Sequence, residues 1–72
     1  MRLYVELYFS PSGKDPLEVV ESLKEIGFEP VVGEYDFAQD YDTPSEYSKM
    51  VEELTRALRG TDTRFRLITR KD

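Results

Sequence analysis

The chain has 72 residues, no Cys, no His and a net charge of −5. A chain of this length makes a single domain, residues 1–72, with a small hydrophobic core. Without Cys there are no disulfides or thiolate metal sites, and without His the commonest metal ligand and general base are missing.

Residues 2–9 alternate strictly between apolar and polar or tyrosine side chains. This period of two predicts a half-buried strand, with Leu3, Val5, Leu7 and Phe9 on its core face. The turn-forming residues 10–13 interrupt it. A helix is expected next, because Asp15 suits the N-cap, Pro16 suits the first helical position, and Gly27 suits the residue after its end.

Residues 28–32 are predicted to form a short strand, and Pro30 places it at an edge because proline cannot donate to a ladder. Gly33–Glu34 is predicted to be a two-residue turn that leads into a returning strand over residues 35–41. One continuous strand from 28 to 38 is the rival interpretation, and it gives the order β-α-β-α-β instead.

Residues 43–46, Thr-Pro-Ser-Glu, are typical of a helix N-terminus with a capping box. The helical spacing of the apolar residues continues to Leu58, and Gly60 ends the helix. Residues 63–70 alternate again and predict a last strand, with Phe65 and Leu67 facing the core.

These elements predict an α+β fold of the ferredoxin-like kind, β-α-β-β-α-β, with both helices on one face of an antiparallel sheet. Phe37 is expected to face the core, because the opposite register would bury two aspartates at a cost of several kcal/mol each. The uncovered face is then expected to carry Arg70 and four residues that we predict to form an interface, because tyrosine and arginine are common at interfaces. These four residues are Tyr4, Tyr8, Arg64 and Arg66.

Several chemistries fit this sequence poorly. Ser12-Gly13-Lys14 lacks the earlier glycine and the following hydroxyl of a phosphate-binding loop, so an ordinary turn is expected. The acidic residues Glu34, Asp36, Asp40 and Asp42 offer oxygen ligands for Mg²⁺ or Ca²⁺, but they lack the spacing of a calcium loop. We expect a solvated acidic edge, with no metal and no cofactor.

Nucleic acid is not an expected partner, because the net charge is negative and Asp36 and Asp40 would repel phosphate on the uncovered face. The charge is uneven: residues 1–55 hold four Lys/Arg and thirteen Asp/Glu, whereas residues 56–72 hold six Lys/Arg and two Asp. An acidic body with a basic last strand favours a homodimer or larger self-assembly.

No apolar run approaches the about 20 residues of a membrane span, and no signal-peptide pattern is seen. We expect no membrane contact and a cytoplasmic location. The high charge content also fits a thermophile.

The segment Val31-Val32-Gly33-Glu34-Tyr35-Asp36-Phe37-Ala38 resembles the Val-x-Gly-[Asp/Glu]-[Tyr/Phe]-Asp segment of the effector-binding domain of the leucine-responsive regulator/AsnC family, the RAM domain. The resemblance implies an ACT-like domain that dimerises through its sheet and binds an amino acid or a similar effector between subunits. It places the ligand near Gly33, Tyr35 and Asp36. The helix-turn-helix part of that family is missing here, so DNA binding is not implied.

We therefore predict a small non-catalytic regulatory or sensing domain that is a homodimer and binds a small metabolite such as an amino acid. The alternative is an assembly or adaptor protein that meets a protein partner through its open sheet face or a strand edge. A carboxylate-based metal or hydrolytic site at Asp36, Asp40 and Asp42 is the weakest alternative. No enzymatic role is expected.

Overall fold

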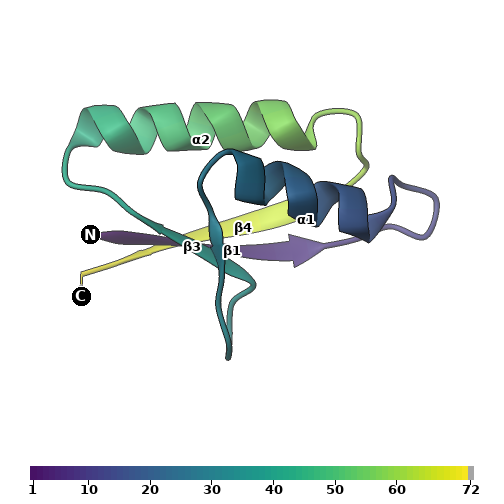
Figure 1. Cartoon of the computed structure of the whole chain (residues 1–72), viewed down its shortest axis with the longest axis horizontal. Coiled ribbons are helices and arrows are strands. Elements are labelled where there is room, and N and C mark those ends of the chain that lie inside the picture. The colour runs from purple at the N-terminus through teal and green to yellow at the C-terminus, as the bar shows by residue number, and fades with distance from the viewer. Residues whose placement is uncertain (72) are drawn as a thin grey trace.

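The computed structural model describes residues 1–71 and shows one four-stranded sheet with two helices on one face (Figure 1). The predicted α+β fold with ferredoxin-like order is confirmed. The elements are β1 (Arg2–Tyr8), α1 (Pro16–Glu25), β2 (Glu29–Pro30), β3 (Phe37–Asp40), α2 (Pro44–Leu58) and β4 (Arg64–Arg70).

The strands follow the order β2-β3-β1-β4 across the sheet, and every neighbouring pair is antiparallel. β1 lies inside the sheet and pairs with β4 along its whole length, from Arg2 opposite Arg70 to Tyr8 opposite Arg64. β3 covers only the first part of β1, ending where Val5 lies opposite Phe37. The second half of β1 therefore has a strand neighbour on one side only.

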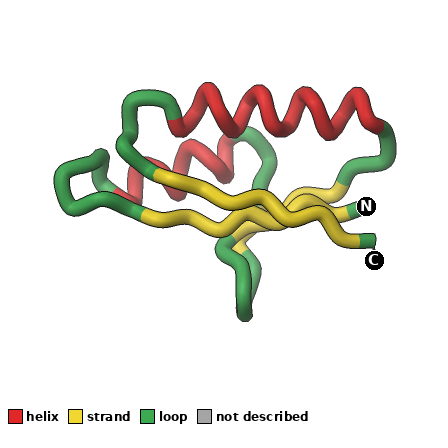
Figure 2. Tube along the Cα trace, turned by 180° about the vertical axis from the view of Figure 1, so that it is seen from behind, coloured by secondary structure: helices red, strands yellow, loops and turns green. Residues whose placement is uncertain are grey.

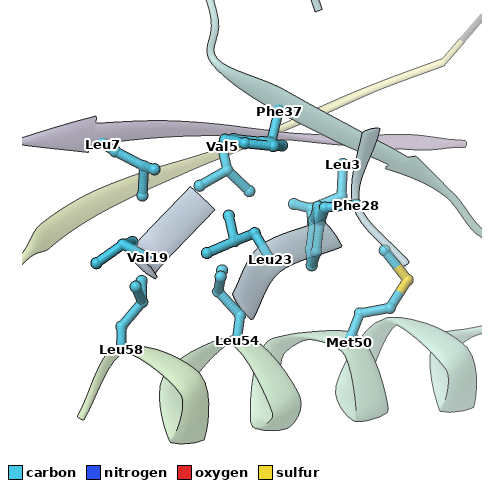
Figure 3. Packing of buried hydrophobic residues seen from close by; sticks show 10 residues of the cluster. All are labelled: Leu3, Val5, Leu7, Val19, Leu23, Phe28, Phe37, Met50, Leu54 and Leu58. Atoms are coloured by element: carbon cyan, nitrogen blue, oxygen red, sulfur yellow. The ribbon is translucent and has the colours of Figure 1, made fainter. Parts of the chain in front are cut away.

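The core lies between the sheet and the two helices (Figure 3). The apolar face of β1 supplies Leu3, Val5 and Leu7, as its alternation predicted. The same prediction is wrong for Phe9, which follows the end of β1 and is 42% exposed. The helices and the remaining segments complete the cluster with Val19, Leu23, Phe28, Phe37, Met50, Leu54 and Leu58.

Both helices begin at the predicted caps. The Asp15 carboxylate accepts a hydrogen bond from the Leu17 amide at 3.0 Å, with Pro16 at the first position of α1. At α2 the capping box is complete, because the Thr43 hydroxyl accepts from the Glu46 amide at 3.1 Å and the Glu46 carboxylate accepts from the Thr43 amide at 3.1 Å. Caps of this kind stabilise a helix by about 1 kcal/mol, which matters in a domain with so small a core.

The chain reverses between β2 and β3, so one continuous strand over 28–38 is wrong and the hairpin is confirmed. The predicted two-residue turn is also wrong. The Val31 amide donates to the Asp36 carbonyl at 3.0 Å and closes a loop of four residues, Val32 to Tyr35. Both strands are shorter than predicted, and Tyr35 leaves the strand to pack on the sheet.

The predicted facing of β3 is confirmed, since Phe37 belongs to the core cluster. Ala38 points to the other side of the sheet and is nevertheless fully buried. Its cross-strand neighbours are Tyr4 and Glu29, so larger side chains cover it. The face away from the helices is thus packed in part, and is not simply a wet surface.

Candidate functional site

The side of the sheet away from the helices, here called the open face, carries the residues of β1 and β4 that alternate with the core residues. β1 presents Arg2, Tyr4, Glu6 and Tyr8, and opposite them on β4 lie Arg70, Ile68, Arg66 and Arg64. This arrangement brings the four predicted interface residues onto the same surface. Whether they contact a partner stays a prediction.

An aromatic and cationic cluster lies at one end of the open face. The rings of Tyr4 and Tyr35 are 5.0 Å apart, centroid to centroid, at an interplanar angle of 38°. The Arg70 guanidinium lies 5.3 Å from the Tyr35 ring centroid and donates a hydrogen bond to the Tyr35 hydroxyl at 3.0 Å. Tyr35 is only 8% exposed as a result. These contacts hold a loop residue rigidly against the sheet.

Ion pairs link the cations of the open face to nearby acids. Arg66 lies 3.9 Å from Glu6, and Arg70 lies 3.9 Å from Glu34. The arginine side chains of these pairs remain more than half exposed. Such pairs contribute at most about 1 kcal/mol each, so both guanidinium groups remain accessible to other anions.

Tyr8 lies at the far end of the open face and is half exposed. Its hydroxyl donates a hydrogen bond to the Glu6 carboxylate. This hydrogen bond is the main reason that the pKa of Tyr8 is raised, with smaller effects from partial desolvation and from the negative charge of Glu6. The neutral phenol is therefore the form that the structure favours.

Asp36 performs a local structural task. Its amide donates to the Val5 carbonyl at 3.0 Å, although the register sets Val5 opposite Phe37. Asp36 and Phe37 thus both lie opposite Val5, as in a β-bulge. The Asp36 carboxylate accepts a hydrogen bond from the Leu7 amide at 2.8 Å. β3 is too short to reach this amide with its own backbone. Asp36 therefore satisfies a backbone donor at the exposed edge of β1.

Gly33 lies in the β2–β3 loop, residues 31–36, with a φ of +116°. A side chain there would be strained by the backbone conformation, although no atom lies within 4 Å of a Cβ built on it. The loop extends from the sheet on the side opposite the helices (Figures 1 and 2). Val32 in this loop is as exposed as in an extended peptide, at 105%.

The three predicted ligand residues therefore share one loop but differ in availability. Tyr35 is packed on Tyr4, Asp36 is bonded to β1, and Gly33 is open to solvent. The sequence reasoning omitted Arg70 from the site residues, although its place on the open face was expected. The signal available in the sequence was the alternation of residues 63–70, which sets Arg70 on the same face as Arg64 and Arg66.

A groove of about 530 Å³ lies beside the start of α2. The rings of Tyr41 and Tyr47 are 5.2 Å apart there, and Met1, Asp42, Thr43, Pro44, Ser48 and Thr69 complete the lining. Thr43 and Glu46 already use amides at the helix start for capping. The groove is broadly open to solvent, and sequence reasoning did not single it out.

The turn at Ser12-Gly13-Lys14 has a purely structural explanation. The Gly13 amide donates to the Ser10 carbonyl and the Lys14 amide donates to the Thr61 carbonyl, both at 3.0 Å. A Cβ on Gly13 would lie only 2.6 Å from the Thr61 carbonyl oxygen. Glycine is therefore needed for close approach to the segment before β4.

Within residues 1–71, no group of three or more acidic side chains is arranged to hold a metal ion. No helix in the same range is long and apolar enough to cross a membrane. Comparison of the chain with protein-family models, curated proteins and solved structures finds no match in any of the three. The RAM-domain resemblance of residues 31–38 remains a prediction.

Proposed function

We propose that this chain is a non-catalytic assembly domain that forms a homodimer through its open face. The observation that carries the proposal is the β2–β3 loop, which extends on the open side of the sheet (Figure 2). Val32 in this loop is fully exposed. Two copies meeting through their open faces would bury this side chain against the sheet of the partner. The residue types of the face support the same assignment, because tyrosine and arginine are enriched at interfaces.

Preorganisation also supports assembly. Tyr35 is already held by Tyr4 and Arg70, so association costs little side-chain ordering at this position. The charges of the face are mixed in sign, with Arg66 beside Glu6 and Arg2 3.6 Å from Asp40. Two such faces can meet with complementary potentials despite the net charge of −5 on each chain.

The test is a matched pair of charge insertions. Val32→Asp places a carboxylate in the proposed interface, whereas Leu17→Asp places one on α1, where Leu17 is 74% exposed. Both positions are exposed, so neither change removes core packing. We expect Val32→Asp to weaken dimerisation at least tenfold in sedimentation velocity and Leu17→Asp to leave it unchanged. A monomeric native chain at micromolar concentration, or equal effects of the two variants, would overturn the proposal.

The effector-binding role implied by the RAM resemblance is a second proposal, favoured by one observation. Arg70 and Glu34 lie 3.9 Å apart at the end of the open face, beside the Tyr35 ring. A cation and a carboxylate at this spacing are complementary to the two charges of an amino acid. The ligand would then lie where the loop meets β4.

A thermal-shift screen with the amino acids tests this second role. Arg70→Gln should abolish any stabilisation by a ligand, because it removes the cation that would bind the ligand carboxylate. Arg56→Gln is the control, since Arg56 is also exposed and pairs with Glu52 at 2.9 Å on α2. An amino acid that stabilises both variants equally would place its site elsewhere. No shift with any amino acid would remove this role and leave the assembly proposal standing.

A further inference from the structure

The two edges of the sheet are unequal. One edge is β2, which has two residues and includes Pro30. A strand so short, with no amide at Pro30, cannot template a neighbour. The other edge is β4, which has seven residues and no proline. The structure therefore leaves one full-length edge on which a further strand can pair.

The backbone groups that β4 offers follow from the alternation of hydrogen bonds in antiparallel pairs. The bond from the Tyr41 amide to the Met1 carbonyl and that from the Asp36 amide to the Val5 carbonyl show that odd-numbered residues of β1 bond toward β3. Even-numbered residues of β1 therefore bond toward β4. In β4 the residues opposite them are also even-numbered. The amides and carbonyls that point to the free edge are those of Phe65, Leu67 and Thr69.

The side chains along this edge are strongly cationic on the open face. Arg64, Arg66 and Arg70 are exposed there, and no acidic residue occurs within β4. In the described part of the chain Arg64 makes no ion pair, and the arginines at 66 and 70 make only long ones. The edge thus combines free backbone groups with positive charge in a chain that is acidic overall.

Self-pairing of β4 is disfavoured by the same charges. When the β4 strands of two copies pair antiparallel with Leu67 opposite Leu67, Arg64 of one copy lies opposite Arg70 of the other. The registers with Arg66 opposite Arg66, or with Ile68 opposite Ile68, also place one arginine opposite another. Like charges directly opposite in a sheet are destabilising. The occupant that fits this edge is therefore a strand of opposite charge.

We propose that the free edge of β4 binds an extended acidic segment of another protein, which pairs antiparallel as a fifth strand of the sheet. Read from its N-terminus, the segment has an acid opposite Arg70, an apolar residue opposite Ile68, and acids opposite Arg66 and Arg64. The intervening residues lie on the helix side next to Leu67 and Phe65, which pack against the core and are only partly covered. Apolar or β-branched side chains suit those positions.

This inference goes beyond the proposed homodimer, because it concerns the edge of the sheet and a different partner. The probe is the synthetic peptide Glu-Thr-Val-Thr-Glu-Val-Glu, and the control peptide carries Lys in place of each Glu. Both are titrated into ¹⁵N-labelled protein. The acidic peptide should shift the amides of Phe65, Leu67 and Thr69 most, with an affinity that falls as salt is raised. The lysine peptide should not bind.

Two substitutions separate edge pairing from general attraction. Thr69→Pro removes one outward amide and keeps the bonds to β1, whereas Thr69→Val keeps that amide. We expect at least a tenfold loss of affinity for the proline variant relative to the valine variant. Arg64→Glu, which needs no change of backbone, should weaken binding at least fivefold, and Arg59→Glu after α2 should not. The proposal would be overturned by equal binding of the two peptides, by amide shifts outside β4, or by an unchanged affinity in both Thr69→Pro and Arg64→Glu. None of these results would exclude the homodimer.

Discussion

The ring of Tyr35 lies 5.0 Å from the ring of Tyr4 and so ties the β2–β3 loop to the centre of the sheet. The other contacts of this loop with the sheet are the hydrogen bonds between Asp36 and β1 and the ion pair of Glu34 with Arg70. Arg70 of β4 contacts the same ring, so three segments distant in sequence meet at one point. This contact fixes the direction in which the loop extends from the open face.

Removing the Tyr35 ring should destabilise the domain and free the loop. We expect Tyr35→Ala to lower the free energy of unfolding by about 2–4 kcal/mol, because a buried aromatic side chain is lost. Tyr35→Phe keeps the ring and loses only the hydrogen bond from Arg70, which should cost about 0.5–1.5 kcal/mol. Urea denaturation followed by circular dichroism measures both. Equal losses for the two variants would mean that the ring packing contributes little.

Asp36 should stabilise the domain through the amide of Leu7. Asp36→Ala leaves that donor without its acceptor and should cost about 1 kcal/mol, whereas Asp36→Asn keeps an acceptor and should cost less. Hydrogen exchange provides a local readout, since the Leu7 amide should exchange faster in the alanine variant. Unchanged exchange at Leu7 would contradict the role that we assign to this carboxylate.

Gly13 and Gly33 should respond to alanine for different reasons. At Gly13 the added Cβ would lie 2.6 Å from the Thr61 carbonyl oxygen, and the resulting backbone shift should cost about 1–3 kcal/mol. At Gly33 the space is free, so only the positive φ is penalised, by about 1 kcal/mol. Thermal unfolding of the two variants should rank Gly13→Ala as the less stable. The reverse order would contradict the steric explanation.

The ionisation of Tyr8 should depend on Glu6. The hydrogen bond to the carboxylate raises the pKa of Tyr8, so the folded chain holds this proton more tightly than the unfolded chain does. The resulting stabilisation is present below pH about 10, the ordinary tyrosine value, and is lost as the pH rises through the raised pKa. In Glu6→Gln the pKa of Tyr8 should fall toward that ordinary value. Titration followed by the NMR shifts of the tyrosine rings measures it, and an unchanged pKa would contradict this cause.

Local patterns in the sequence account well for the elements with a clear period or cap. The alternation in β1 correctly places Leu3, Val5 and Leu7 in the core, and the capping residues Asp15 and Thr43 mark both helix starts. These features depend on neighbours within a few residues, which a sequence displays directly. The burial cost of aspartate also sufficed to orient β3 with Phe37 inward.

The β2–β3 loop shows where such patterns fail. Gly33 correctly indicated a reversal, but the length of the turn depended on Tyr35 leaving the strand for Tyr4, a partner far away in the sequence. The bond from the Leu7 amide to Asp36 forms because β3 pairs with β1 only as far as Val5 and does not reach Leu7. Neither contact has a local signature, so the sequence did not show that Tyr35 and Asp36 hold the loop against β1.

An isotope-filtered NOE experiment tests the proposed homodimer most directly. Equal amounts of labelled and unlabelled chain are mixed, and only contacts between different molecules are recorded. We expect intermolecular contacts from the methyl groups of Val32 to side chains of the open face, such as Tyr4 and Ile68. Intermolecular contacts confined to the helices, or none at concentrations where the chain is fully folded, would contradict it.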